Sequence, residues 1–205
     1  MNVFSTPHRF AAPRVLGLAL LLSAGHLLRG AILVTEATLD GPSESPPNAS
    51  PGTGFATVTY DSVAHTLRVE VSFSDLLGTV TASHIHAPTA VPGTGTAGVA
   101  TQTPYFTGFP IGVTSGTYDD TFDLTAASSW NPSYVTANGG TVFAAEAALA
   151  AALADGKAYL NVHTTVFGGG EIRGFLVPVP EPALAGLVAG LGLCGFGAWR
   201  RFRRA

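Results

Sequence analysis

The chain has 205 residues, of which 11% are charged and 46% hydrophobic, a composition that argues against a disordered or nucleic-acid-coating protein. Its single cysteine excludes an intrachain disulfide and any multi-cysteine zinc or iron–sulfur site. Acidic residues far outnumber basic ones in residues 32–178, so this segment would repel polyphosphate and no nucleic-acid partner is expected.

Residues 1–31 have the order of a secretory signal peptide. Arg9 and Arg14 form a basic start, and an uninterrupted apolar run and small residues follow. The other interpretation is a buried core helix, but the proline-rich flank on one side and a strand-like pattern on the other argue against it. This segment therefore predicts export of the chain.

Residues 32–178 predict one β-rich domain. The clearest strand is 66–73, where apolar side chains alternate with Arg68 and Glu70. Frequent glycine and proline residues favour turns between short strands. The expected strands cover residues 32–39, 55–60, 66–73, 80–87, 116–124, 158–165 and 171–177. About seven short strands are typical of an antiparallel, Greek-key-like β-sandwich.

One α-helix is expected as an insertion at about 141–154, because this stretch consists almost entirely of strong helix formers. Thr141 is a suitable N-cap, and Asp155 and Gly156 are suitable for ending the helix. Residues 128–137 before it predict a short helical turn or loop.

Three histidines of this domain are candidate metal ligands. His84 and His86 are two residues apart, so both point to one face of a strand, and His163 shares the face of a later strand with Tyr159 and Asn161. We expect the three imidazoles to converge, and such a set suits copper or zinc, with redox chemistry as the enzymatic alternative. The other interpretation is a polar structural cluster without a cofactor. No catalytic constellation is found in the sequence, so a non-enzymatic protein is expected.

Two further sets of charged residues allow two interpretations each. Glu171 and Arg173 predict either an exposed same-face ion pair or an Arg173 that lies over the histidine face and attracts an anion. Asp119, Asp120 and Asp123 suggest either a calcium site or a solvated strand edge. Their spacing lacks the regular pattern of a calcium loop, which favours the edge.

Residues 179–205 combine a short motif, an uncharged apolar segment at 183–199 and a basic end. The motif is Val179, Pro180, Glu181 and Pro182, and the basic end is Arg200, Arg201, Arg203 and Arg204. The apolar segment is expected to form a transmembrane helix, and the arginines predict a cytoplasmic C-terminus. A plain single-pass anchor is one interpretation.

The order of these three parts resembles the PEP-CTERM sorting signal of Gram-negative bacteria. The resemblance implies an exosortase-type partner that recognises and processes the tail after export. It also implies transient anchoring in the inner membrane, followed by release to the cell surface or the extracellular space.

Several motifs of the middle domain match a known family in the right order. They are Leu39-Asp40-Gly41, Gly54–Tyr60, Ala82–Pro88, Gly116–Tyr118, Tyr159–Thr164 and Gly169–Gly174. Together they resemble the CHRD domain, which was first delineated in chordin, although Ala87 stands where the family usually has glycine. The resemblance implies a secreted β domain. We expect it to be a binding or structural module that interacts with the cell envelope, exopolysaccharide or protein partners.

The order of the histidine motifs, a glycine-rich turn and Arg173 also loosely resembles copper–zinc superoxide dismutase, itself a Greek-key β-sandwich. The chain departs from that family because it lacks a bridging histidine, a zinc-loop histidine cluster and a cysteine pair. The sequence thus predicts three parts: a signal peptide at 1–31, a CHRD-like domain at 32–178 and a sorting segment at 179–205.

Overall fold

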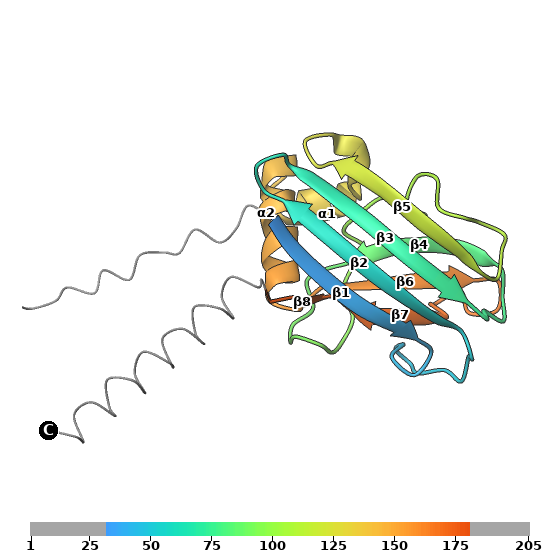
Figure 1. Ribbon diagram of the computed structural model, residues 1–205. Coiled ribbons are helices and arrows are strands. Elements are labelled where there is room, and N and C mark those ends of the chain that lie inside the picture. Colours follow the sequence, from blue (N-terminus) through green and yellow to red (C-terminus); the bar gives the residue numbers. More distant parts are fainter. Residues whose placement is uncertain (1–31, 181–205) are drawn as a thin grey trace, which may run out of the picture.

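Eight strands form one antiparallel sheet in the computed structural model, which describes residues 32–180 (Figure 1). The strands are β1 (Ile32–Asp40), β2 (Thr53–Asp61), β3 (Thr66–Ser74), β4 (Val80–His86), β5 (Gly116–Asp123), β6 (Tyr159–Thr164), β7 (Ile172–Phe175) and β8 (Val177–Pro178). Their order in the sheet is β4-β6-β7-β1-β2-β3-β5, and β8 also pairs with β1. The predicted mainly-β, antiparallel class is confirmed.

In the half of the sheet built from β1, β2, β3 and β5, the alternation of apolar and polar side chains explains which face is buried. In β3, the apolar residues predicted to share one face are buried: Leu67, Val69, Val71 and Phe73. Arg68 between them is exposed on the other face, where it forms an ion pair with Asp119 of β5. Period-two alternation therefore sets which face of this half covers the core.

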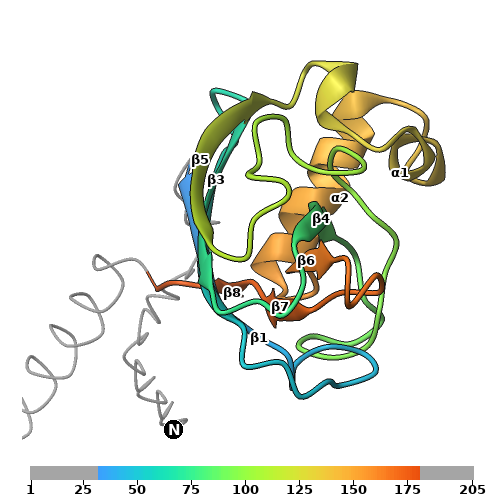
Figure 2. The same ribbon diagram turned by 90° about the vertical axis from the view of Figure 1, so that its right-hand side faces the viewer.

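The expected sandwich of two separate sheets is replaced by one curled sheet. β1 pairs with β2 along its whole length, while its other edge meets β7 through the single pair Asp40 and Arg173 and meets β8 further along. Figure 2 shows how the curl brings β4, β6 and β7 opposite β3 and β5. Because β1 is hydrogen-bonded on both edges, the two halves are continuous. One hydrophobic core fills the space between them.

The predicted inserted helix is confirmed as α2 (Val142–Ala154). Thr141 is its N-cap and accepts a hydrogen bond from the N–H of Ala144 at 3.2 Å. Leu149 and Leu153 of α2 are buried in the core. The expected short helical turn before it consists of a 3-10 turn (Ala127–Ser129) and the helix α1 (Pro132–Ala137).

Within residues 32–180, none of the helices has the length and apolar character needed to cross a membrane. The expected signal peptide at 1–31 and the expected transmembrane helix at 183–199 lie outside these residues. Of the sorting motif, Val179 and Pro180 are described, and the N–H of Val179 donates to the carbonyl of Val34 in β1.

Candidate metal centre

The three candidate histidines lie on one face of the paired strands β4 and β6. His84 and His86 are two residues apart in β4, so their side chains point the same way. In the antiparallel register, Ala82 lies opposite His163, and His84 lies opposite Asn161. Because opposite residues project from the same face, the pairing places His163 beside His84.

The three imidazoles converge, as the sequence pattern predicts. One ring nitrogen from each of His84, His86 and His163 lies within 4.8 Å of the other two. The ring centroid of His84 is 4.7 Å from that of His86 and 4.8 Å from that of His163. Among the described residues this is the one group of three histidine, cysteine or carboxylate side chains close enough to share an ion. The remaining described histidine, His65, instead binds the carboxylate of Glu146 at 2.9 Å.

Backbone carbonyls fix the orientation of two of the rings. Nδ1 of His86 lies 2.7 Å from the carbonyl oxygen of Ala97, and Nδ1 of His163 lies 3.0 Å from that of Gly168. A carbonyl oxygen only accepts, so each Nδ1 carries the proton, and each Nε2 of a neutral ring keeps a lone pair. Nε2 of His86 and Nδ1 of His84 are buried without a hydrogen-bond partner in the described part of the chain. For His86 and His163, a ring held through Nδ1 by a backbone carbonyl is the arrangement usual for metal-ligating histidines.

Burial keeps the three rings neutral. Burial, together with the charges that His86 and His163 would carry, lowers the pKa of His84 to about 3. Burial also lowers the pKa of His86 and of His163, although the hydrogen bonds to Ala97 and Gly168 oppose the change. Neutral imidazoles are the form that binds a metal ion, so no proton has to leave before an ion enters at neutral pH.

A fourth polar side chain faces the same three rings. Asn161 is buried in β6, and its Oδ1 lies 3.1 Å from Nε2 of His163. The Asn161 side chain also raises the pKa of His84 and of His86, against the larger effect of burial. Sequence reasoning places Asn161 beside His163 and assigns it no role, because its position opposite His84 depends on the β4–β6 register.

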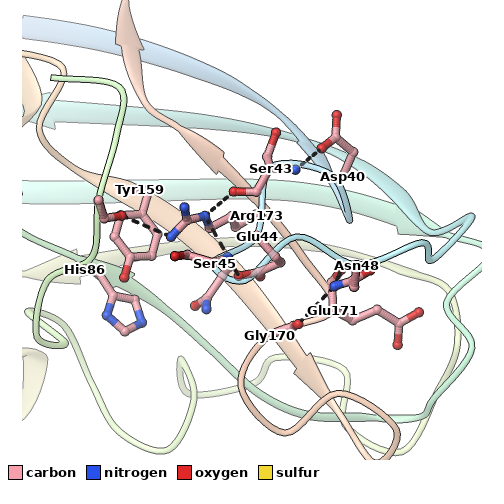
Figure 3. A network of polar contacts seen from close by, with 12 residues as sticks. Asp40, Ser43, Glu44, Ser45, Asn48, His86, Tyr159, Gly170, Glu171 and Arg173 are labelled. Atoms are coloured by element: carbon pink, nitrogen blue, oxygen red, sulfur yellow. Dashed lines mark hydrogen bonds and ion pairs between the residues drawn. The ribbon is translucent and has the colours of Figure 1, made fainter.

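Arg173 lies on the continuation of this face in β7, opposite Asn161 of β6. Its guanidinium carbon is 4.8 Å from the ring centroid of Tyr159, and that ring stacks on His86 with centroids 4.7 Å apart. Figure 3 shows Arg173 between Tyr159 and the loop that follows β1. From this loop Ser43 accepts a hydrogen bond from Nε of Arg173. Arg173 thus contacts the histidine face through the Tyr159 ring, on which His86 stacks.

The prediction of an exposed ion pair between Glu171 and Arg173 is wrong. Both side chains are buried, and Arg173 pairs with Glu44 at 3.8 Å instead. Glu171 precedes β7, and its carboxylate accepts hydrogen bonds from the hydroxyls of Ser50 and Thr164, each at 2.6 Å. It also accepts from the N–H groups of residues 77 and 78. The alternative, that Arg173 attracts an anion, stays a prediction.

The three aspartates of the acidic cluster in β5 have separate partners. Asp119 forms a two-bond pair with Arg68, at 2.8 and 2.7 Å. Asp123 accepts hydrogen bonds from Thr125, and Asp120 accepts one from the backbone of Thr121. Each aspartate therefore has its own partner on an exposed edge strand, in agreement with the solvated strand edge that the spacing favours.

Comparison with known proteins gives one match. Neither the curated protein sequences nor the solved structures contain a protein that matches this chain. The model of the CHRD domain family matches residues 35–176, which include the whole of the histidine face and well over half of the chain. The chain therefore belongs to the CHRD domain family.

Proposed function

We propose that this protein is an exported, non-enzymatic surface protein whose CHRD domain binds one copper or zinc ion through His84, His86 and His163. The observation that carries the proposal is the approach of three ring nitrogens to within 4.8 Å of one another on a partly buried face. Imidazole nitrogen is a preferred ligand of both metals. A tetrahedral ion with bonds of ~2.0–2.1 Å holds its ligands about 3.4 Å apart, so small ring rotations would close the site.

The electrostatic environment supports a bound cation more than a purely structural cluster. A buried, unpartnered ring nitrogen costs free energy, and the cluster contains two, Nδ1 of His84 and Nε2 of His86. A structural cluster would be expected to satisfy these atoms with hydroxyl or backbone groups. A divalent ion accepts lone pairs from several such nitrogens at once.

Metal analysis of the purified full chain tests the proposal. After chelator treatment and dialysis, the protein should bind about one equivalent of copper or zinc in a calorimetric titration. His84→Gln and His163→Gln should each weaken binding by more than the roughly 10–100-fold typical of losing an outer partner. His65→Gln is the matched control, because His65 binds Glu146 away from the cluster. A wild-type protein that binds neither metal would overturn the proposal.

Export and sorting form the second part of the proposal, and the sequence supports them. The N-terminal basic and apolar order provides a signal peptide, and Pro180-Glu181-Pro182, the apolar segment and the arginines provide an exosortase substrate. The chain would pass the inner membrane, remain anchored by its tail, and reach the cell surface or matrix after processing. Envelope components or exopolysaccharide would then be its partners.

Cell fractionation tests this part independently of the metal. Wild-type protein should leave the membrane fraction in a processed form when the exosortase is present, and Glu181→Ala should accumulate there unprocessed. Glu36→Ala is the control, because Glu36 is exposed on β1 and outside the tail. Wild-type protein that stays in the cytosol, or a Glu181→Ala variant processed normally, would contradict the sorting proposal.

A further inference from the structure

We infer that Asn161 supplies the fourth ligand of the bound ion through its Oδ1, so that the three-histidine site is closed. The inference rests on the proposed metal-binding function and deepens it, because it assigns the coordination number and the reactivity of the ion. A site of three nitrogens and one protein oxygen leaves no position for water or substrate.

The placement of Asn161 in the sheet is fixed by the backbone. Asn161 lies opposite His84 in the β4–β6 register and between Tyr159 and His163 on the same face of β6. On its other side it lies opposite Arg173 of β7, so both edges of this strand are paired. Its side chain is 3% exposed. A residue held by both neighbouring strands and covered from solvent has to direct its amide within the histidine face.

In the contact between Asn161 and His163, the amide oxygen of Asn161, rather than its NH₂ group, faces the ring. Nδ1 of His163 bonds the carbonyl of Gly168, so the one proton of a neutral ring lies there and Nε2 is an acceptor. Oδ1 of Asn161 is also an acceptor, and it lies 3.1 Å from that Nε2. Two lone pairs that face each other in a buried site attract a positive charge placed between them.

The neighbouring rings add buried, unpartnered nitrogens to the same cluster. Nε2 of His86 is buried and unpartnered while Nδ1 of that ring is held by Ala97. Nδ1 of His84 is likewise buried and unpartnered within the described residues. Three nitrogens and one amide oxygen therefore meet on one face, which matches four-coordinate zinc.

This donor set also predicts which ion is held and what it does. An amide oxygen is a hard ligand, so it favours Zn²⁺ or Cu²⁺ over Cu⁺, which prefers thiolate and thioether sulfur. Catalytic zinc sites keep three protein ligands and an open fourth position, whereas structural sites use four protein ligands. With Asn161 bound, the ion is held in the way of a structural or storage site.

Cobalt substitution of the full chain tests the inference, because Co²⁺ replaces Zn²⁺ and its visible bands report the ligands. With wild-type protein, added azide should leave the Co²⁺ bands unchanged, because no open position exists. Asn161→Ala should bind Zn²⁺ more than about 100-fold more weakly, beyond the loss typical of an outer partner, and azide should shift its Co²⁺ bands. Asn161→Asp, which replaces the amide by a stronger oxygen ligand, should bind Zn²⁺ about 10-fold more tightly. Asn138→Ala is the control, because Asn138 caps α1 and bonds Tyr134.

The outcomes separate this inference from the proposed function. Wild-type protein that binds no Zn²⁺ or Co²⁺ overturns both. Wild-type protein that binds Co²⁺ but responds to azide overturns the closed site alone, as does Asn161→Ala with wild-type Zn²⁺ affinity. If Asn161→Ala does not fold, Asn161→Asp and the azide response of the wild type still test whether the site is closed. An Asp variant that folds and binds Zn²⁺ more weakly contradicts a ligand role.

Discussion

The carboxylate of Glu44 lies 3.8 Å from the guanidinium of Arg173, and both side chains are buried. Burial raises the pKa of Glu44 to about 7, although the Arg173 charge and a hydrogen bond from the N–H of Ser45 lower it. Oε1 of Glu44 has no hydrogen-bond partner in the described part of the chain. The ion pair therefore compensates only partly for the cost of burying this carboxylate.

Replacing Glu44 by glutamine should remove a pH dependence of stability. The folded-state pKa of about 7 exceeds the ordinary value of 4.5, so the folded state binds the proton more tightly than the unfolded state. The stabilisation is fully present below pH 4.5 and is lost as the pH rises through 7. Relative to Glu44→Gln, wild-type stability should fall by on the order of 3 kcal/mol between pH 4.5 and pH 8. Urea unfolding at several pH values in this range measures the difference.

The control for this prediction is Glu36→Gln on β1, because Glu36 is exposed and its loss should leave the pH profile parallel to that of the wild type. Parallel profiles for wild type and Glu44→Gln would show that the buried pair does not set the dependence.

Glu171→Gln should destabilise the domain by about 2–4 kcal/mol in urea unfolding. Burial raises the pKa of Glu171, but hydrogen bonds from Ser50, Thr164 and the N–H groups of residues 77 and 78 lower it by more. The pKa therefore lies below its ordinary value, and the carboxylate is charged. A glutamine side chain turns an NH₂ group toward one of these donors. The two loops and β6 would then lose a shared acceptor. An equal loss for the exposed Glu36→Gln would refute the explanation.

The strands and the shared face of His84 and His86 were predictable because both depend on local pattern. Alternation in β3 and the two-residue spacing of His84 and His86 determine which side chains share a face. The role of Glu171 was not predictable, because it follows Gly170 at φ 126° and precedes β7. Alternation along the strand therefore does not govern its direction. The exposed ion pair was wrong for this reason.

The continuity of the sheet could not be predicted either. It depends on the pair Asp40 and Arg173, which joins β1 to β7 from distant parts of the sequence. Strand pattern specifies faces but not which distant strands become neighbours. The pairing of Asn161 with His84, and hence the fourth side chain of the candidate site, depends on register in the same way.

Gly174→Ala should prevent normal folding or cost more than about 3 kcal/mol, because a Cβ at this position would overlap the backbone carbonyl of Thr38 in β1. The backbones of β7 and β1 approach closely here, next to the pair that joins the two halves of the sheet. Gly98→Ala is the matched control, since a Cβ there meets no atom within 4 Å. Thermal unfolding of both variants compares them. Equal melting temperatures would show that β1 and β7 can move apart without cost.

Zinc should raise the melting temperature of the full chain, because an ion that binds the folded state alone stabilises it by mass action. At a free concentration 100 times the dissociation constant, the gain is about 2.7 kcal/mol. For a domain of this size, that corresponds to a rise of roughly 5–10 °C, which a chelator should reverse. His163→Gln should lose the rise and His65→Gln should keep it, since only His163 belongs to the cluster. A rise that persists in His163→Gln would place the stabilising ion elsewhere on the protein, so the comparison of these two variants locates the site as well as detecting it.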